Sequence, residues 1–226
     1  MPSFAESTLI VLKKDLLIEI RTREIVTTAG FFAALTTVMA SFAFYSGETT
    51  TRKVGPGAIW LPIAFASVLA LSRTWQRERE ENALLGLLVA PIPRAALFAG
   101  KAIGVAAFIS VTALIVVPIV GLLFHVELGP ICLPLAALLL LGVIGIAAMG
   151  TLFGAMTVRT RARDLILASV LFPLLAPMML AGVAGTRDVF EGAPMSELRS
   201  FFVILAVFDA IAIAGGLGMF GALVED

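Results

Sequence analysis

A run of alternating charges, Arg77–Glu81, is the feature of this chain most suited to binding a partner. A leucine-rich stretch follows, and Pro91 and Pro93 end it because proline donates no backbone hydrogen bond and restrains the preceding residue. The pattern predicts a short charged helix over about 77–90 that transmits a partner's movement. A solvated loop is the alternative. The residues expected to couple to the partner are Arg77, Glu78, Arg79, Glu80, Glu81, Leu84, Leu87, Leu88, Pro91 and Pro93.

Asp209 is an acidic residue nine positions into an apolar segment. A carboxylate at the centre of a membrane costs about 2.5–3.5 kcal/mol on insertion scales. We therefore expect its side chain to face other helices or a watery cleft, or to be protonated. A functional or subunit-pairing role and a purely structural role both remain open.

The residue inventory argues against several enzyme classes. The chain has one histidine, His125, and one cysteine, Cys132, which cannot build a disulfide, a cysteine-based zinc site or a two-histidine haem site. Phe98–Ala102 looks like the end of a phosphate loop, but the upstream glycine is missing and Ala102 replaces the serine or threonine. We predict a non-catalytic chain with no metal site and no cofactor bound by this chain alone, and His125 as a wetted loop residue.

Composition indicates a membrane protein. Of the 226 residues, 60% are apolar and 14% are charged, and the mean hydropathy is +1.05. A soluble domain has about 25% charged residues and about 45–50% apolar ones. The formal net charge is zero, so there is no basic footprint for nucleic acid.

The apolar residues fall into continuous stretches, which favour helices over an alternating barrel pattern. They predict an all-α, polytopic membrane protein with one transmembrane domain over 1–226. A separate stretch over about 4–20 has Leu9, Leu12, Leu16 and Ile20 at helical spacing and suits an interfacial helix on the membrane surface. The six spans are expected at about 25–45, 58–75, 102–124, 131–158, 165–183 and 200–224.

The basic residues predict the orientation. Segments 1–24, 73–101 and 159–164 fall on one side and hold 12 of the 16 lysines and arginines. Basic residues concentrate in cytoplasmic loops, so both termini are expected in the cytoplasm. The short loop over 159–164 on that side contains Arg159, Arg161, Arg163 and Asp164.

Prolines, glycines and tryptophans predict how the spans bend, pack and sit in the membrane. Pro173 and Pro177 should bend the fifth span, as a hinge or as static packing. Two glycine pairs at one-turn spacing, Gly100 with Gly104 and Gly150 with Gly154, permit close helix contact. Trp60 and Trp75 are expected to anchor the chain at the two membrane interfaces.

Two blocks of sequence resemble the cytochrome c maturation protein B family, also called the haem exporter protein B family. Arg77–Pro93 is similar to the family's RERE-[D/E]-[G/N]-x-L-x-x-L-x-x-[S/A]-P-x-P pattern. Gly150–Gly154, Val158–Arg163 and Leu171–Pro177 are similar to its GTLF…VRTRAR…PLL-x-P stretch. Asn82 and Gly86 depart modestly from the pattern.

The resemblance implies an ABC-2-type permease fold and a membrane subunit of an ABC-type complex in the bacterial inner membrane. ATP and magnesium would bind a separate ATPase, the maturation A protein. Further partners would be a second copy of the chain, the maturation C and D proteins and a haem chaperone. The complex would handle haem, either by transporting it or by releasing haem-loaded chaperone. An ABC-2-type export permease for a lipid, drug or polysaccharide is the alternative.

Overall fold

The computed structural model describes residues 2–44, 48–80, 86, 89–157 and 163–225, with the backbone alone at 48–52, 77, 79–80, 157, 163–168 and 225. These residues form long helices, and the all-helical, polytopic membrane fold predicted from the sequence is confirmed. The helices are α1 (Phe4–Thr22), α2 (Glu24–Ala43), α3 (Glu48–Glu80), α5 (Arg94–Leu123), α6 (Leu128–Thr157), α7 (Arg163–Phe190) and α8 (Met195–Glu225).

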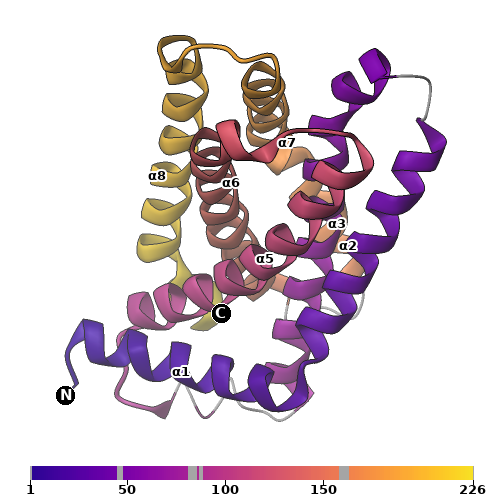
Figure 1. Cartoon of the computed structure of the whole chain (residues 1–226). Helices are drawn as coiled ribbons and strands as arrows, with labels where there is room; N and C mark the ends of the chain where they lie inside the picture. The colour runs from indigo at the N-terminus through magenta and orange to yellow at the C-terminus, as the bar shows by residue number, and fades with distance from the viewer. Residues whose placement is uncertain (1, 45–47, 81–85, 87–88, 158–162, 226) are drawn as a thin grey trace.

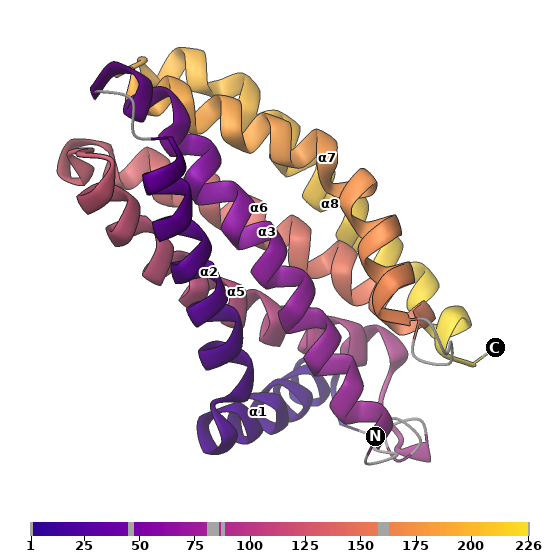
Figure 2. The ribbon, with the colours of Figure 1, turned by 90° about the vertical axis from the view of Figure 1, so that its right-hand side faces the viewer.

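Six of these helices contain segments long and apolar enough to cross a membrane. α1 instead runs across one end of the bundle, where the chain also starts and finishes (Figure 1). We call this the α1 end. Figure 2 shows the bundle from the side, with α1 beneath the other helices. The candidate spans are Glu24–Ala43, Lys53–Gln76, Arg94–Leu123, Leu128–Met156, Ser169–Phe190 and Met195–Val224.

α1 begins with a capping box, in which Ser3 and Glu6 satisfy each other's free backbone N–H groups. It ends at Arg23, whose φ of 54° is the left-handed conformation that stops helices. Its buried stripe differs from the leucine stripe that the sequence suggested. Leu9 and Ile20 are exposed, whereas the buried positions are Ser7, Val11, Asp15 and Glu19.

α1 packs along the first half of α5 because α5 offers glycines there. A Cβ at Gly100 would lie 2.7 Å from Val11 Cβ and 2.9 Å from the Thr8 carbonyl oxygen. One turn later, a Cβ at Gly104 would lie 3.8 Å from Asp15. The glycine pair thus lets the α1 backbone approach α5 closely.

α6 is a central helix of the bundle and contacts α3, α5, α7 and α8. Its glycines accept large side chains of α3: Trp60 at Gly142, Leu71 at Gly150 and Trp75 at Gly154. Both tryptophans are buried, so the expectation that they anchor the chain at the membrane interfaces is wrong. Trp60 can be buried because its indole N–H donates to Thr186 Oγ1 at 2.8 Å, which satisfies the ring's one polar group.

Two further features lie on the outside of the bundle. Pro173 and Pro177 sit one turn apart on the exposed side of α7, which remains a single helix through both. His125 is exposed in the turn between α5 and α6, as expected for a wetted loop residue.

We predict that Gly100→Leu weakens the contact between α1 and α5. The added side chain meets Val11 and the Thr8 carbonyl, and overpacking of this kind costs about 1–3 kcal/mol. The free energy of unfolding in mild detergent, measured by sodium dodecyl sulfate titration, should fall accordingly. Gly218→Leu on α8 is the control, because a Cβ there meets nothing within 4 Å. Equal stability of the two variants would show that α1 is not packed as described.

Candidate functional site

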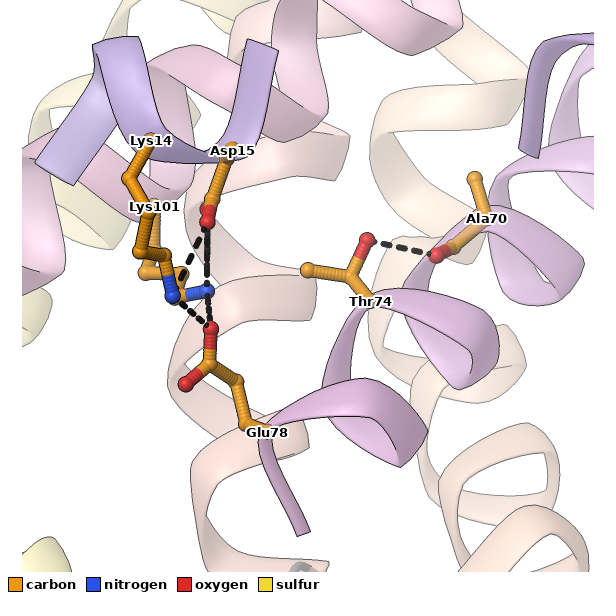
Figure 3. Close-up of polar contacts among 6 residues, drawn as sticks. All are labelled: Lys14, Asp15, Ala70, Thr74, Glu78 and Lys101. Atoms are coloured by element: carbon orange, nitrogen blue, oxygen red, sulfur yellow. Dashed lines mark hydrogen bonds and ion pairs between the residues drawn. The ribbon is translucent and has the colours of Figure 1, made fainter. Parts of the chain in front are cut away.

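Four charged side chains from three helices meet at the α1 end of the bundle: Lys14 and Asp15 of α1, Glu78 of α3 and Lys101 of α5 (Figure 3). We call them the charged junction. Lys101 Nζ lies 2.9 Å from Asp15 Oδ2 and 3.1 Å from Oδ1, and it donates to Glu78 Oε1. Lys14 Nζ donates to the same Glu78 oxygen and lies 3.3 Å from Asp15 Oδ1. The two cations balance the two carboxylates.

Burial makes the junction energetically important. Lys101 is 1% exposed, Glu78 3% and Asp15 7%. A buried charge must be paired, because its lost hydration costs several kcal/mol. Only Lys14 reaches solvent substantially, with 31% of its side chain exposed. Removing any one member therefore leaves an uncompensated charge inside the protein.

The junction also explains where the third span begins. The apolar pattern predicts a start at about 102, but α5 begins at Arg94 and includes Lys101. Asp15 and Glu78 neutralise Lys101, so the helix can continue through it. The Pro93 carbonyl accepts the backbone N–H groups of Ala96 and Leu97 and starts the first turn.

Opposite charges shift the pKa of two junction members. Burial alone would raise the pKa of the Glu78 carboxyl, but the charge and hydrogen bonds of Lys101 and Lys14 outweigh it, and the pKa is lowered. Burial alone would lower the pKa of Lys14, but Asp15 and Glu78 outweigh it, and the pKa is raised. Both shifts favour the charged forms of Glu78 and Lys14.

Neighbouring contacts on α3 support the junction. Lys101 Nζ lies 6.0 Å from the centroid of the Trp75 ring, within the range of a cation–π contact. Thr74, one turn before Glu78, donates its hydroxyl to the Ala70 carbonyl at 2.8 Å and so takes no part in the junction (Figure 3). Arg73 pairs with Glu24 at 3.0 Å, which links α3 to the start of α2.

The structure changes the role predicted for Glu78. We expected this side chain to project towards a partner, but it points into the bundle and is buried. Arg77–Glu80 are the last residues of α3, so a separate helix does not begin at 77. The reason is that Lys101 and Lys14 compensate Glu78 and let α3 continue as a helix past the apolar part of its span.

The other residues of the predicted coupling element have different outcomes. Pro91 and Pro93 are exposed, just before α5. Arg77, Arg79 and Glu80 lie in the α3 backbone, and their side chains are not described. Glu81, Leu84, Leu87 and Leu88 lie outside the described residues, as do Arg159 and Arg161 of the second loop. Arg163 and Asp164 begin α7, again without described side chains.

Asp209 lies apart from the charged junction, halfway along α8. It is 5% exposed, and neither carboxyl oxygen has a hydrogen-bond partner among the described residues. A Cβ at Gly145 of α6 would lie 2.5 Å from its Oδ1 and 2.7 Å from Met178 Sδ of α7. The carboxyl group therefore sits where α6, α7 and α8 meet.

Sequence reasoning missed Lys14, Asp15 and Lys101 as parts of one site. Their signal was their position: Lys14 and Asp15 interrupt the apolar pattern of α1, and Lys101 interrupts that of α5. A charge that interrupts an apolar pattern predicts a position at the membrane surface, whereas in the fold each of these charges pairs with an opposite charge from another helix. No cluster suited to a metal ion occurs in the part of the chain that the structure describes. The site can link helices, and it offers no group placed for covalent chemistry.

Comparison with known proteins gives consistent matches. The family model described as "CcmB protein" matches residues 6–222. The "Heme exporter protein B" of Paracoccus denitrificans is 30% identical over 186 residues, which cover 82% of this chain and 83% of the relative. That of Bradyrhizobium diazoefficiens is 24% identical, with 92% and 95% covered. That of Pseudomonas aeruginosa is 26% identical, with 87% and 89% covered.

We predict that Lys101→Met destabilises the protein by about 3–5 kcal/mol, because it leaves two buried carboxylates facing one lysine. The double variant Lys101→Met/Glu78→Met restores the charge balance through Lys14 and Asp15. It should be more stable than the sum of the two single variants implies, by about 0.5–3 kcal/mol. Unfolding free energies of all four proteins in mild detergent measure this coupling. Strict additivity would rule out a shared junction.

We also predict a pH dependence. The lowered pKa of Glu78 contributes stability above its ordinary value of 4.5, and this contribution is lost as the pH falls through the folded-state value. Glu78→Gln lacks the titrating group. The stability difference between wild type and Glu78→Gln should be constant just above pH 4.5 and shrink in more acidic solution. Thermal unfolding at a series of pH values tests this, and a difference that grows on acidification would contradict it.

Proposed function

The chain belongs to the CcmB protein family, and on that premise we propose how it acts as the membrane subunit of the ABC-type haem export system for cytochrome c maturation. The chain itself is non-catalytic. A separate ATPase subunit binds ATP and magnesium, and this chain converts the resulting movement into work in the membrane. That work is either haem transport or the release of haem-loaded chaperone.

The charged junction is the observation that carries the coupling mechanism. The predicted partner-binding segment 77–93 begins in the last turn of α3 and ends at the start of α5. Glu78 and Lys101, near its two ends, are joined to each other and to α1. A push on the segment therefore moves α1, α3 and α5 together, because breaking the junction would strand buried charges.

We place the α1 end in the cytoplasm, with both termini there. Lys13 and Arg21 on α1 and Arg23 directly after it are exposed at this end. An excess of basic residues on the cytoplasmic side supports this orientation. The exposed leucines of α1 then contact the lipid of the inner leaflet, as in an interfacial helix.

The ATPase subunit is proposed to be the maturation A protein, and it contacts the exposed part of segment 77–93. The complex also contains a second copy of this chain, the maturation C and D proteins and a haem chaperone. A family match over residues 6–222 favours this assignment over an export permease for a lipid, drug or polysaccharide.

We predict that coupling and docking can be separated by mutation. Arg79→Glu/Glu80→Lys reverses two charges of the predicted coupling element and should release the ATPase subunit from the tagged complex. Lys101→Met/Glu78→Met leaves Arg79 and Glu80 unchanged, so the ATPase subunit should still co-purify while cytochrome c maturation falls at least tenfold. Pull-down in mild detergent and haem staining of cytochromes c measure the two effects.

The control is Arg187→Glu at the opposite end of the bundle, where Arg187 pairs with the exposed Glu191. It should affect neither readout. Loss of the ATPase subunit from the Lys101→Met/Glu78→Met variant, at normal abundance of the chain, would contradict a purely transmitting role for the junction.

A further inference from the structure

A cavity of about 320 Å³ lies beside the elbow where α1 turns into α2. Its walls come from α1, α2 and the middle of α5, so it spans the corner between the helix that crosses the end of the bundle and a helix that enters it. The side chains that form its apolar walls are Leu16, Ile20, Val26, Ala107, Phe108 and Val111.

The polar rim of the cavity is small and contains one reachable cation. Arg23 is exposed, and within the described part of the chain its guanidinium forms no hydrogen bond or ion pair. Glu19, also at the rim, is 5% exposed and accepts the Val26 backbone N–H at 2.8 Å, so it is turned inwards and engaged. Thr27 completes the rim, and its hydroxyl bonds to the Arg23 carbonyl.

The elbow holds this rim in place. Arg23 is a non-glycine residue with φ of 54°, and its N–H donates to the Glu19 carbonyl at 2.7 Å. The Glu19 side chain then binds the N-terminal turn of α2. Two hydrogen bonds thus fix the angle between α1 and α2, and they keep Arg23 beside the opening of an apolar cavity.

We propose that this elbow cavity binds an anionic phospholipid, with an acyl chain against the apolar walls and the headgroup phosphate on Arg23. The volume accommodates roughly ten water-sized groups at about 30 Å³ each, which suits a segment of one acyl chain. An unpaired guanidinium at the membrane surface attracts anionic headgroups. The bound lipid fills the corner under α1 and supports the angle at which α1 meets the bundle.

The wall chemistry argues against haem as the occupant, although haem is also an anionic amphiphile. None of the lining residues is a histidine, cysteine, methionine or tyrosine, so the cavity supplies no axial ligand for iron. The proposal requires only that the chain spans a membrane with α1 at its surface. It does not depend on the chemistry of haem export.

The experiment uses the full chain in nanodiscs with equal amounts of phosphatidylglycerol and phosphatidylcholine. Native mass spectrometry after release from the nanodisc counts the lipids that remain bound. Wild type should keep one phosphatidylglycerol in preference to phosphatidylcholine. Ala107→Trp fills the cavity and should lose the retained lipid of both kinds. Ala210→Trp, on the exposed face of α8, is the matched control and should keep it.

Arg23→Gln should keep a lipid but lower the preference for phosphatidylglycerol by about fivefold, the ratio expected for one arginine at an anionic surface. Arg21→Gln, an exposed arginine outside the cavity lining, should leave the preference unchanged. Val111→Trp tests the cavity from α5 again if Ala107→Trp does not fold. Unchanged retention in the folded cavity-filling variant, or displacement of the lipid by added haem, would overturn the proposal.

Discussion

The buried charge of Lys101 is the constraint on which the arrangement at the α1 end depends. An ammonium group that is 1% exposed needs carboxylates at hydrogen-bond distance, and they come from two other helices. Asp15 brings α1 against α5, and Glu78 requires α3 to continue as a helix beyond the apolar part of its span. This one requirement sets the direction of α1, and it allows α5 to be helical over its first eight residues, from Arg94 to Lys101.

Small residues make the same arrangement sterically possible. Glycines on α5 let α1 come close enough for Asp15 to reach Lys101, and glycines on α6 receive the tryptophans of α3. In a membrane the apolar residues gain little by leaving lipid for protein, so helix association depends on close packing and on polar contacts. This chain uses both, and its charged junction lies where three helices meet.

These features suit a subunit that transmits movement. The described residues hold no cluster for a metal ion, and the charged junction bonds helices to one another. Membership of the CcmB family supplies the context, the membrane subunit of an ABC-type haem export system. Asp209 takes no part in the junction. Its buried carboxyl group lies in the middle of α8 and has no hydrogen-bond partner among the described residues.

The sequence by itself determined the class of protein, the number of apolar spans and the family, because hydropathy over about 20 residues and short charged motifs are local properties. It could not determine that Glu78 turns inwards, that Lys14, Asp15 and Lys101 join it, or that both tryptophans are buried. Each of these outcomes depends on which side chain from a distant helix arrives opposite it. Only tertiary packing decides that, since a lone charge or the indole N–H of Trp60 is expected to be exposed until its partner is known, and Trp75 is buried against Gly154 of α6.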